Sequence, residues 1–95
     1  MVGYLIARVC ITDPQQYKQY TDRTPAVIAK FGGKFIVRGG PIVNLEGPEE
    51  SGRIVVIEFP SVEHVKAFYS SPEYQEIKKF RLGAATGSLI AVEGM

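Results

Sequence analysis

The 95-residue sequence predicts an α+β fold, with four strands in one antiparallel sheet and helices on one of its faces. Two observations predict it. Segments of strand and helix character follow the order strand, helix, strand, strand, helix, strand. Two of the strand segments are apolar on both sides, which is typical of strands in the middle of a sheet. The simplest right-handed connection of this order is the ferredoxin-like arrangement, formed here by a single domain over residues 1–95.

The first strand is expected over residues 2–11, followed by a helix. Alternation places Leu5, Ala7, Val9 and Ile11 on one face, and Tyr4, Ile6, Arg8 and Cys10 on the other. Asp13 caps the helix and Pro14 suits its first position. Because Pro25 removes a backbone donor, we expect a kink or two short helices, with Thr24 capping the second. Gly32 ends the helical segment.

Two glycine pairs bracket the second strand, which is expected over residues 34–38. Residues 41–45 are apolar enough to extend this strand beyond a glycine bulge at Gly39-Gly40. A polar turn then leads into the third strand at Arg53–Phe59. Its four consecutive branched apolar residues predict a central strand that is buried on both faces.

The second helical segment opens at Pro60-Ser61 and restarts at Ser71-Pro72, where a capping serine precedes a first-turn proline. Its inner stripe is expected to contain Val62, Val65, Phe68, Tyr69, Tyr74 and Ile77, with either Phe80 or Arg81 next. The last strand is expected over residues 87–93.

One face of this sheet has no helix to cover it. The apolar residues on that face, such as Ile6, predict an interface, because a large exposed apolar surface marks an interaction site. We therefore expect a homodimer in which two sheets pack face to face.

The composition argues against several classes of function. A formal net charge of +1 argues against nucleic-acid binding, and no apolar run approaches the length of a membrane span. We see no secretory signal, and a lone Cys10 fits the reducing cytoplasm. With Cys10 and a lone His64, the usual metal ligands are too few, so we expect no metal, haem or other cofactor.

Several short motifs, taken together, are typical of one protein family. They are Thr12-Asp13-Pro14 with Tyr17 and Tyr20, Gly32-Gly33-Lys34, Val37-Arg38-Gly39-Gly40, Glu46-Gly47, Ile57-Glu58-Phe59-Pro60-Ser61, Tyr69-Ser70-Ser71-Pro72-Glu73-Tyr74, Arg81 and Glu93-Gly94. Over nearly its whole length the sequence resembles the family known only as domain of unknown function 1330, within the dimeric α+β barrel superfamily. Phe68 is a departure, since many similar sequences have tryptophan there.

The resemblance implies a homodimer built sheet to sheet and no assigned activity. Distant members of the superfamily include cofactor-free monooxygenases, small-molecule isomerases and haem enzymes, but a shared fold does not transfer function.

Five residues are candidates for binding a small organic ligand: Arg38, Glu58, Tyr17, Tyr20 and Tyr69. If the second strand continues to the turn, Arg38 comes opposite Glu58, and the two form either a structural pair or part of a ligand site. The tyrosines supply phenols to a pocket, or they are core residues with their hydroxyls at its edge.

Two functions remain open at this point. The first is a cofactor-independent enzyme that acts on a small organic molecule in a pocket between sheet and helices. The second is a non-catalytic dimer that binds a metabolite or a partner. A well-formed cavity of some hundreds of Å³, with Arg38 and a tyrosine pointing in, favours the first; a sheet face packed solid, with Arg38 and Glu58 paired to each other, favours the second.

Overall fold

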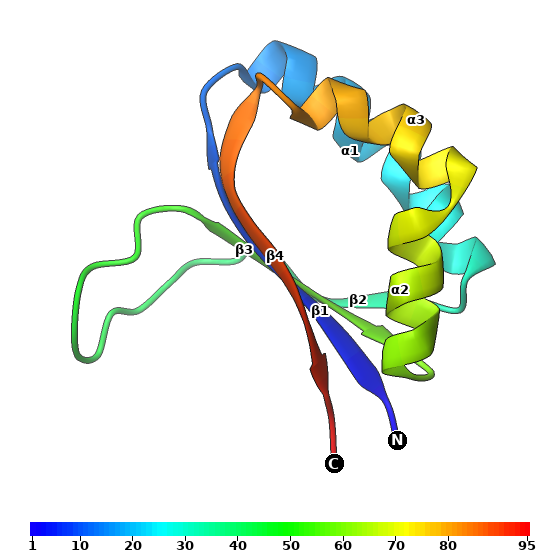
Figure 1. Ribbon diagram of the computed structural model, residues 1–95. Helices are drawn as coiled ribbons and strands as arrows, with labels where there is room; N and C mark the ends of the chain where they lie inside the picture. The colour runs from blue at the N-terminus through cyan, green and yellow to red at the C-terminus, as the bar shows by residue number, and fades with distance from the viewer.

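A computed structural model describes all 95 residues as one sheet with three helices on one face (Figure 1). In chain order the elements are β1 (Gly3–Ile11), α1 (Pro14–Lys30), β2 (Lys34–Arg38), β3 (Arg53–Phe59), α2 (Val62–Ser70), α3 (Pro72–Arg81) and β4 (Ala85–Glu93). The strands lie in the order β2-β3-β1-β4, and every neighbouring pair is antiparallel. This is the predicted ferredoxin-like α+β architecture.

The helix caps follow the sequence closely. The Asp13 side chain accepts a hydrogen bond from the backbone N–H of Gln16 at 3.1 Å, and Pro14 occupies the first helical position, where a missing N–H costs nothing. Ser71 both ends α2 and caps α3, accepting from the N–H of Tyr74 at 3.1 Å. The predicted restart at Ser71-Pro72 is therefore confirmed.

The expected alternative of two short helices that meet at Pro25 is wrong, because α1 runs from Pro14 to Lys30 as one helix. Thr24 does not cap a second helix and is instead buried on the inner side of α1. Buried residues lie both before and after the proline, at Tyr17 and Val27, so packing on both sides keeps the segment helical despite the lost hydrogen bond.

The expected extension of β2 is also wrong. The strand ends at Arg38, and residues 39–52 form a loop without strand structure that projects away from the helices (Figure 1). The bulge lies earlier than expected, between Phe35 and Val37, where Phe35 pairs with Ile57 but Val37 pairs with Val56. The last strand begins at Ala85, two residues before the predicted start.

The core lies between the helices and the sheet. It is built from the inner face of β1 and β3 and the inner stripes of the helices, and its largest fully buried side chains are Tyr74, Phe59 and Phe68. The Phe68 ring centroid is 4.6 Å from that of Tyr74 and 5.5 Å from that of Phe59. This aromatic cluster fixes α2 and α3 against β3.

The opposite face of the sheet, here called the open face, carries a row of apolar residues that crosses all four strands. In register, Val37 pairs with Val56, Val56 with Ile6, and Ile6 with Ile90. Ile90 keeps 52% of its surface accessible and Val37 keeps 41%. The prediction of an uncovered apolar sheet face is thus confirmed. None of the three helices is long and apolar enough to span a lipid bilayer.

Candidate ligand-binding site

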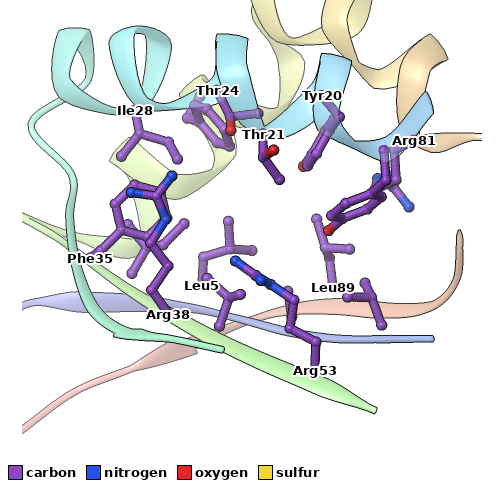
Figure 2. Close-up of a pocket in the computed structure, with 16 residues that line it drawn as sticks. Leu5, Tyr20, Thr21, Thr24, Ile28, Phe35, Arg38, Arg53, Arg81 and Leu89 are labelled. Carbon is purple, nitrogen blue, oxygen red and sulfur yellow. The ribbon is translucent and has the colours of Figure 1, made fainter. Parts of the chain in front are cut away.

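A cavity lies between α1 and the inner face of the sheet, with about 40 Å³ of free volume. Its polar lining residues are Thr21, Thr24, Arg38, Arg53 and Arg81, and the other eleven are apolar or aromatic. In Figure 2, Arg38 and Arg53 extend from the sheet into the same space that Thr21, Thr24 and Tyr20 enter from α1. We call this space the arginine cavity, after Arg38, Arg53 and Arg81.

No acidic side chain lines the arginine cavity. The six ion pairs of the chain all involve other residues, so none of the three guanidinium groups lies within 4.0 Å of a carboxylate. Moreover, the Nε atoms of Arg53 and Arg81 are buried and have no hydrogen-bond partner. A buried charged donor without an acceptor is costly, so the cavity is suited to an anion that would supply acceptors.

Arg38 enters the cavity because of the bulge in β2. The shift between Phe35 and Val37 places Arg38 opposite Val55, on the inner face of the sheet. Its guanidinium carbon lies 4.2 Å from the centroid of the Phe35 ring. Stacking on this ring orients the planar guanidinium while leaving its N–H edge available.

Arg53 begins β3 and faces the same side of the sheet as Val55 and Ile57. Its guanidinium packs over Gly39, where a Cβ atom would lie 2.9 Å from the guanidinium carbon. Gly39 also has φ +70°, a conformation that glycine adopts readily and other residues adopt at a cost. The glycine that follows β2 therefore makes room for Arg53.

Arg81 is the last residue of α3, and α1 holds its backbone in place. The Gln16 side-chain amide donates to the carbonyls of Phe80 and Leu82, at 3.2 and 3.3 Å, on either side of Arg81. Burial alone would lower the pKa of Arg81, but the nearby phenols of Tyr74 and Tyr20 outweigh it and raise that pKa. The arginine is therefore always cationic in the cavity.

Two phenols complete the lining. Burial raises the pKa of Tyr17, although the positive charges of Arg53 and Arg81 act in the opposite direction. Burial and the neighbouring Tyr74 phenol raise the pKa of Tyr20, whose hydroxyl lies 2.9 Å from that of Tyr74. Both lining tyrosines are thus neutral at ordinary pH and keep their hydroxyl protons, and the Tyr20 hydroxyl already shares a hydrogen bond with that of Tyr74.

The cavity contains donors in abundance and no group that titrates near neutrality as a base. Such an arrangement can bind a carboxylate, or stabilise negative charge that develops on a bound oxygen. No group of three or more His, Cys, Asp or Glu side chains is arranged to hold a metal ion.

The structure brings three of the five predicted site residues together: Arg38, Tyr17 and Tyr20. Tyr69 lies instead in an adjoining groove. The predicted juxtaposition of Arg38 and Glu58 is wrong. Glu58 pairs in register with Lys34, and the Lys34 Nζ lies 3.2 Å from a Glu58 carboxylate oxygen.

Sequence reasoning did not single out Arg53, and it left the inward position of Arg81 undecided. The sequence pattern could have indicated both positions. In β3, alternation puts Arg53 on the same face as Val55, Ile57 and Phe59. In α3, Arg81 continues the inner stripe formed by Tyr74 and Ile77.

The fold and the site together define a ferredoxin-like α+β protein with a cationic cavity between its helices and its sheet. The chain belongs to the family described as Domain of unknown function (DUF1330), whose model matches residues 2–95. The resemblance inferred from the sequence motifs is confirmed. No curated protein matches the chain.

Solved structures share the fold over almost the entire chain. A protein of unknown function from Rhodopseudomonas palustris is 24% identical, with a TM-score of 0.77 over 99% of this chain and 82% of that one. SnoaB, a cofactor-independent oxygenase from Streptomyces nogalater, is 12% identical, with a TM-score of 0.70 over 99% and 93%. A dimeric protein of unknown function from Bacteroides fragilis, described as ferredoxin-like, is 18% identical, with a TM-score of 0.63 over 98% and 96%. At these identities the likeness shows the fold alone.

Proposed function

We propose that this protein binds a small organic anion and holds its anionic group, such as a carboxylate, in the arginine cavity. One observation carries the proposal: three arginines line a space that no acidic side chain lines, and two of their Nε atoms are buried without a partner. A bound carboxylate would offer about four lone-pair sites to these donors, and arginine binds carboxylates with two parallel hydrogen bonds.

The binding unit in this proposal is a homodimer formed through the open face. The row from Val37 to Ile90 offers a continuous apolar strip across the sheet. The loop after β2 adds further apolar surface, since Val43 is 78% and Leu45 91% exposed. A stable dimer should bury more than about 1,000 Å² of total surface. The dimer that the Bacteroides fragilis protein forms on this fold is consistent with the proposal.

Calorimetric titration with benzoate tests the binding proposal. Arg53→Ala and Arg81→Ala should each weaken binding by about tenfold or more, since a charge-assisted hydrogen bond contributes about 1.5–3 kcal/mol. Arg23→Ala is the matched control, because Arg23 lies on the exposed side of α1 and outside the cavity lining. Equal affinities for the native protein and all three variants would contradict the proposal.

A cofactor-independent enzyme is a second candidate, which the concentration of neutral phenols and guanidinium groups favours. These donors would stabilise an enolate oxygen formed when a bound carbonyl compound loses its α-proton to solvent. The test is deuterium exchange at the methylene carbon of phenylpyruvate, which lies next to its keto group, in D₂O, followed by NMR. If the native protein accelerates the exchange and Arg81→Ala does so less, the protein is a catalyst. If exchange is no faster than in buffer alone, the protein only binds the compound.

We also propose that the protein acts in the cytoplasm, because its one cysteine, Cys10, is free and exposed. Recovery of the protein outside the cytoplasm on cell fractionation would contradict this assignment.

A further inference from the structure

A second hollow adjoins the arginine cavity and is far larger. It is a groove of about 410 Å³ between α2 and the edge strand β4. Its lining residues are Leu5, Val65, Lys66, Tyr69, Ser70, Arg81, Gly87, Leu89, Ile90 and Ala91. Leu5, Arg81 and Leu89 line both spaces, so the groove meets the cavity at these three residues. In Figure 2, Leu89 and Arg81 lie at one end of the cavity and Arg38 at the other.

The two spaces differ in what they can hold. About 40 Å³ in the cavity is room for a few water molecules or a small anionic group, whereas sites for organic ligands are typically about 300–1,000 Å³. The groove falls in that range, and six of its ten lining residues are apolar or aromatic. An organic body therefore fits the groove and not the cavity.

The groove wall has the character of a site for an apolar ring or chain. Tyr69 presents an aromatic ring there, held by packing 5.4 Å from the Tyr74 ring centroid. No acidic side chain lines the groove, so nothing in it repels a ligand with a carboxylate at one end. Arg81, whose buried Nε has no partner, lies where the groove and the cavity meet.

We propose that the natural ligand is an amphipathic carboxylic acid whose carboxylate lies at Arg81 in the arginine cavity and whose apolar ring or chain lies in the groove between α2 and β4. This inference rests on the proposed anion binding and names the class of ligand. Acetate alone would occupy only the cavity, and a longer acid would gain affinity from each carbon that it places in the groove.

The test is an NMR titration of the native protein with acetate, benzoate, phenylacetate and 3-phenylpropionate, repeated on Ala91→Trp. Ala91 is exposed on an edge strand, where tryptophan is well tolerated, and the indole would fill the groove beside Leu5. Ala91→Ser, which keeps the groove open, is the control for the substitution itself. Each added methylene should raise affinity about three- to fourfold in the native protein.

In Ala91→Trp the affinity for acetate should be unchanged, and the larger acids should no longer bind more tightly than acetate. If the native protein binds acetate as tightly as the larger acids, the proposal of an amphipathic ligand is wrong, although the anion site still stands. If the larger acids still bind more tightly than acetate in Ala91→Trp, their apolar part does not lie in the groove. If none of the four acids perturbs the Arg81 resonances, the anion site itself fails and the inference falls with it.

Discussion

The guanidinium of Arg53 occupies the space in front of Gly39, so close that a Cβ on Gly39 would lie 2.9 Å from the Arg53 guanidinium carbon. The backbone N–H of Gly39 donates to the carbonyl of Ile54 at 2.8 Å, which ties the exit of β2 to the start of β3. One glycine thus sets both the end of β2 and the position of a cavity arginine.

Gly39→Ala should therefore displace Arg53 and weaken carboxylate binding. It should also lower the free energy of unfolding by about 1–2 kcal/mol, because φ +70° is strained for alanine. Gly47→Ala is the control for strain alone, since Gly47 has φ +87° but nothing within 4 Å of its would-be Cβ. Gly39→Ala should weaken benzoate binding and Gly47→Ala should not. Equal affinities in the two variants would show that Gly39 does not position Arg53.

Arg38 and Glu58 should behave as independent residues. They lie on opposite faces of the sheet, so the effects of Arg38→Ala and Glu58→Gln on the free energy of unfolding should add within about 0.5 kcal/mol. Lys34 and Glu58 form the exposed pair, which should couple by about 1 kcal/mol or less. Urea unfolding at one fixed protein concentration measures both cycles. A coupling of several kcal/mol between Arg38 and Glu58 would contradict the register described here.

The buried phenols should make the fold sensitive to alkali. The pKa of Tyr20 is raised by burial and then by Tyr74, so above about pH 10 the unfolded chain releases a proton that the folded chain retains. The free energy of unfolding should then fall with rising pH, by up to about 1.4 kcal/mol per pH unit for each such phenol. Tyr20→Phe should flatten the slope above pH 10 and leave it unchanged near pH 7. If the free energy of unfolding falls equally steeply with pH in Tyr20→Phe and in the native protein, Tyr20 is not the cause of the alkali sensitivity.

The open face should hold the proposed dimer together. Ile6 lies in a central strand at the middle of the apolar row, between Val56 and Ile90. Ile6→Lys should yield monomers, because an unpaired ammonium group buried in an apolar interface costs several kcal/mol. Ile6→Val, which keeps the face apolar, should remain dimeric. Light scattering at micromolar concentration measures both, and a monomeric native protein would end the dimer proposal.

The sequence predicted the fold well because its signals are local. The cap at Asp13, the restart at Ser71-Pro72 and the apolar run of β3 each specify an element without reference to the rest of the chain. The effect of Pro25 could not be predicted locally, because it depends on tertiary packing. The buried residues on both sides of it keep α1 one continuous helix.

The site was harder to predict because it depends on strand register. The bulge at Ile36 carries no glycine or other sequence mark, yet it determines that Arg38 faces the cavity and pairs with Val55. Glu58 could not be assigned to a face, since β3 is apolar on both sides. The cluster of Arg38, Arg53 and Arg81 joins two strands and a helix end that are far apart in the chain, which no local pattern reveals.

The buried, unpartnered Nε–H groups of Arg53 and Arg81 should donate hydrogen bonds to an anionic ligand. The most direct measurement is of the Nε–H resonances of ¹⁵N-labelled arginine side chains during a benzoate titration, assigned with Arg53→Lys and Arg81→Lys. We predict that the Arg53 and Arg81 Nε–H signals shift downfield and saturate together, while the signal of the exterior Arg23 stays in place. Signals of Arg53 and Arg81 that move no more than that of Arg23 would show that the cavity arginines do not bind the carboxylate.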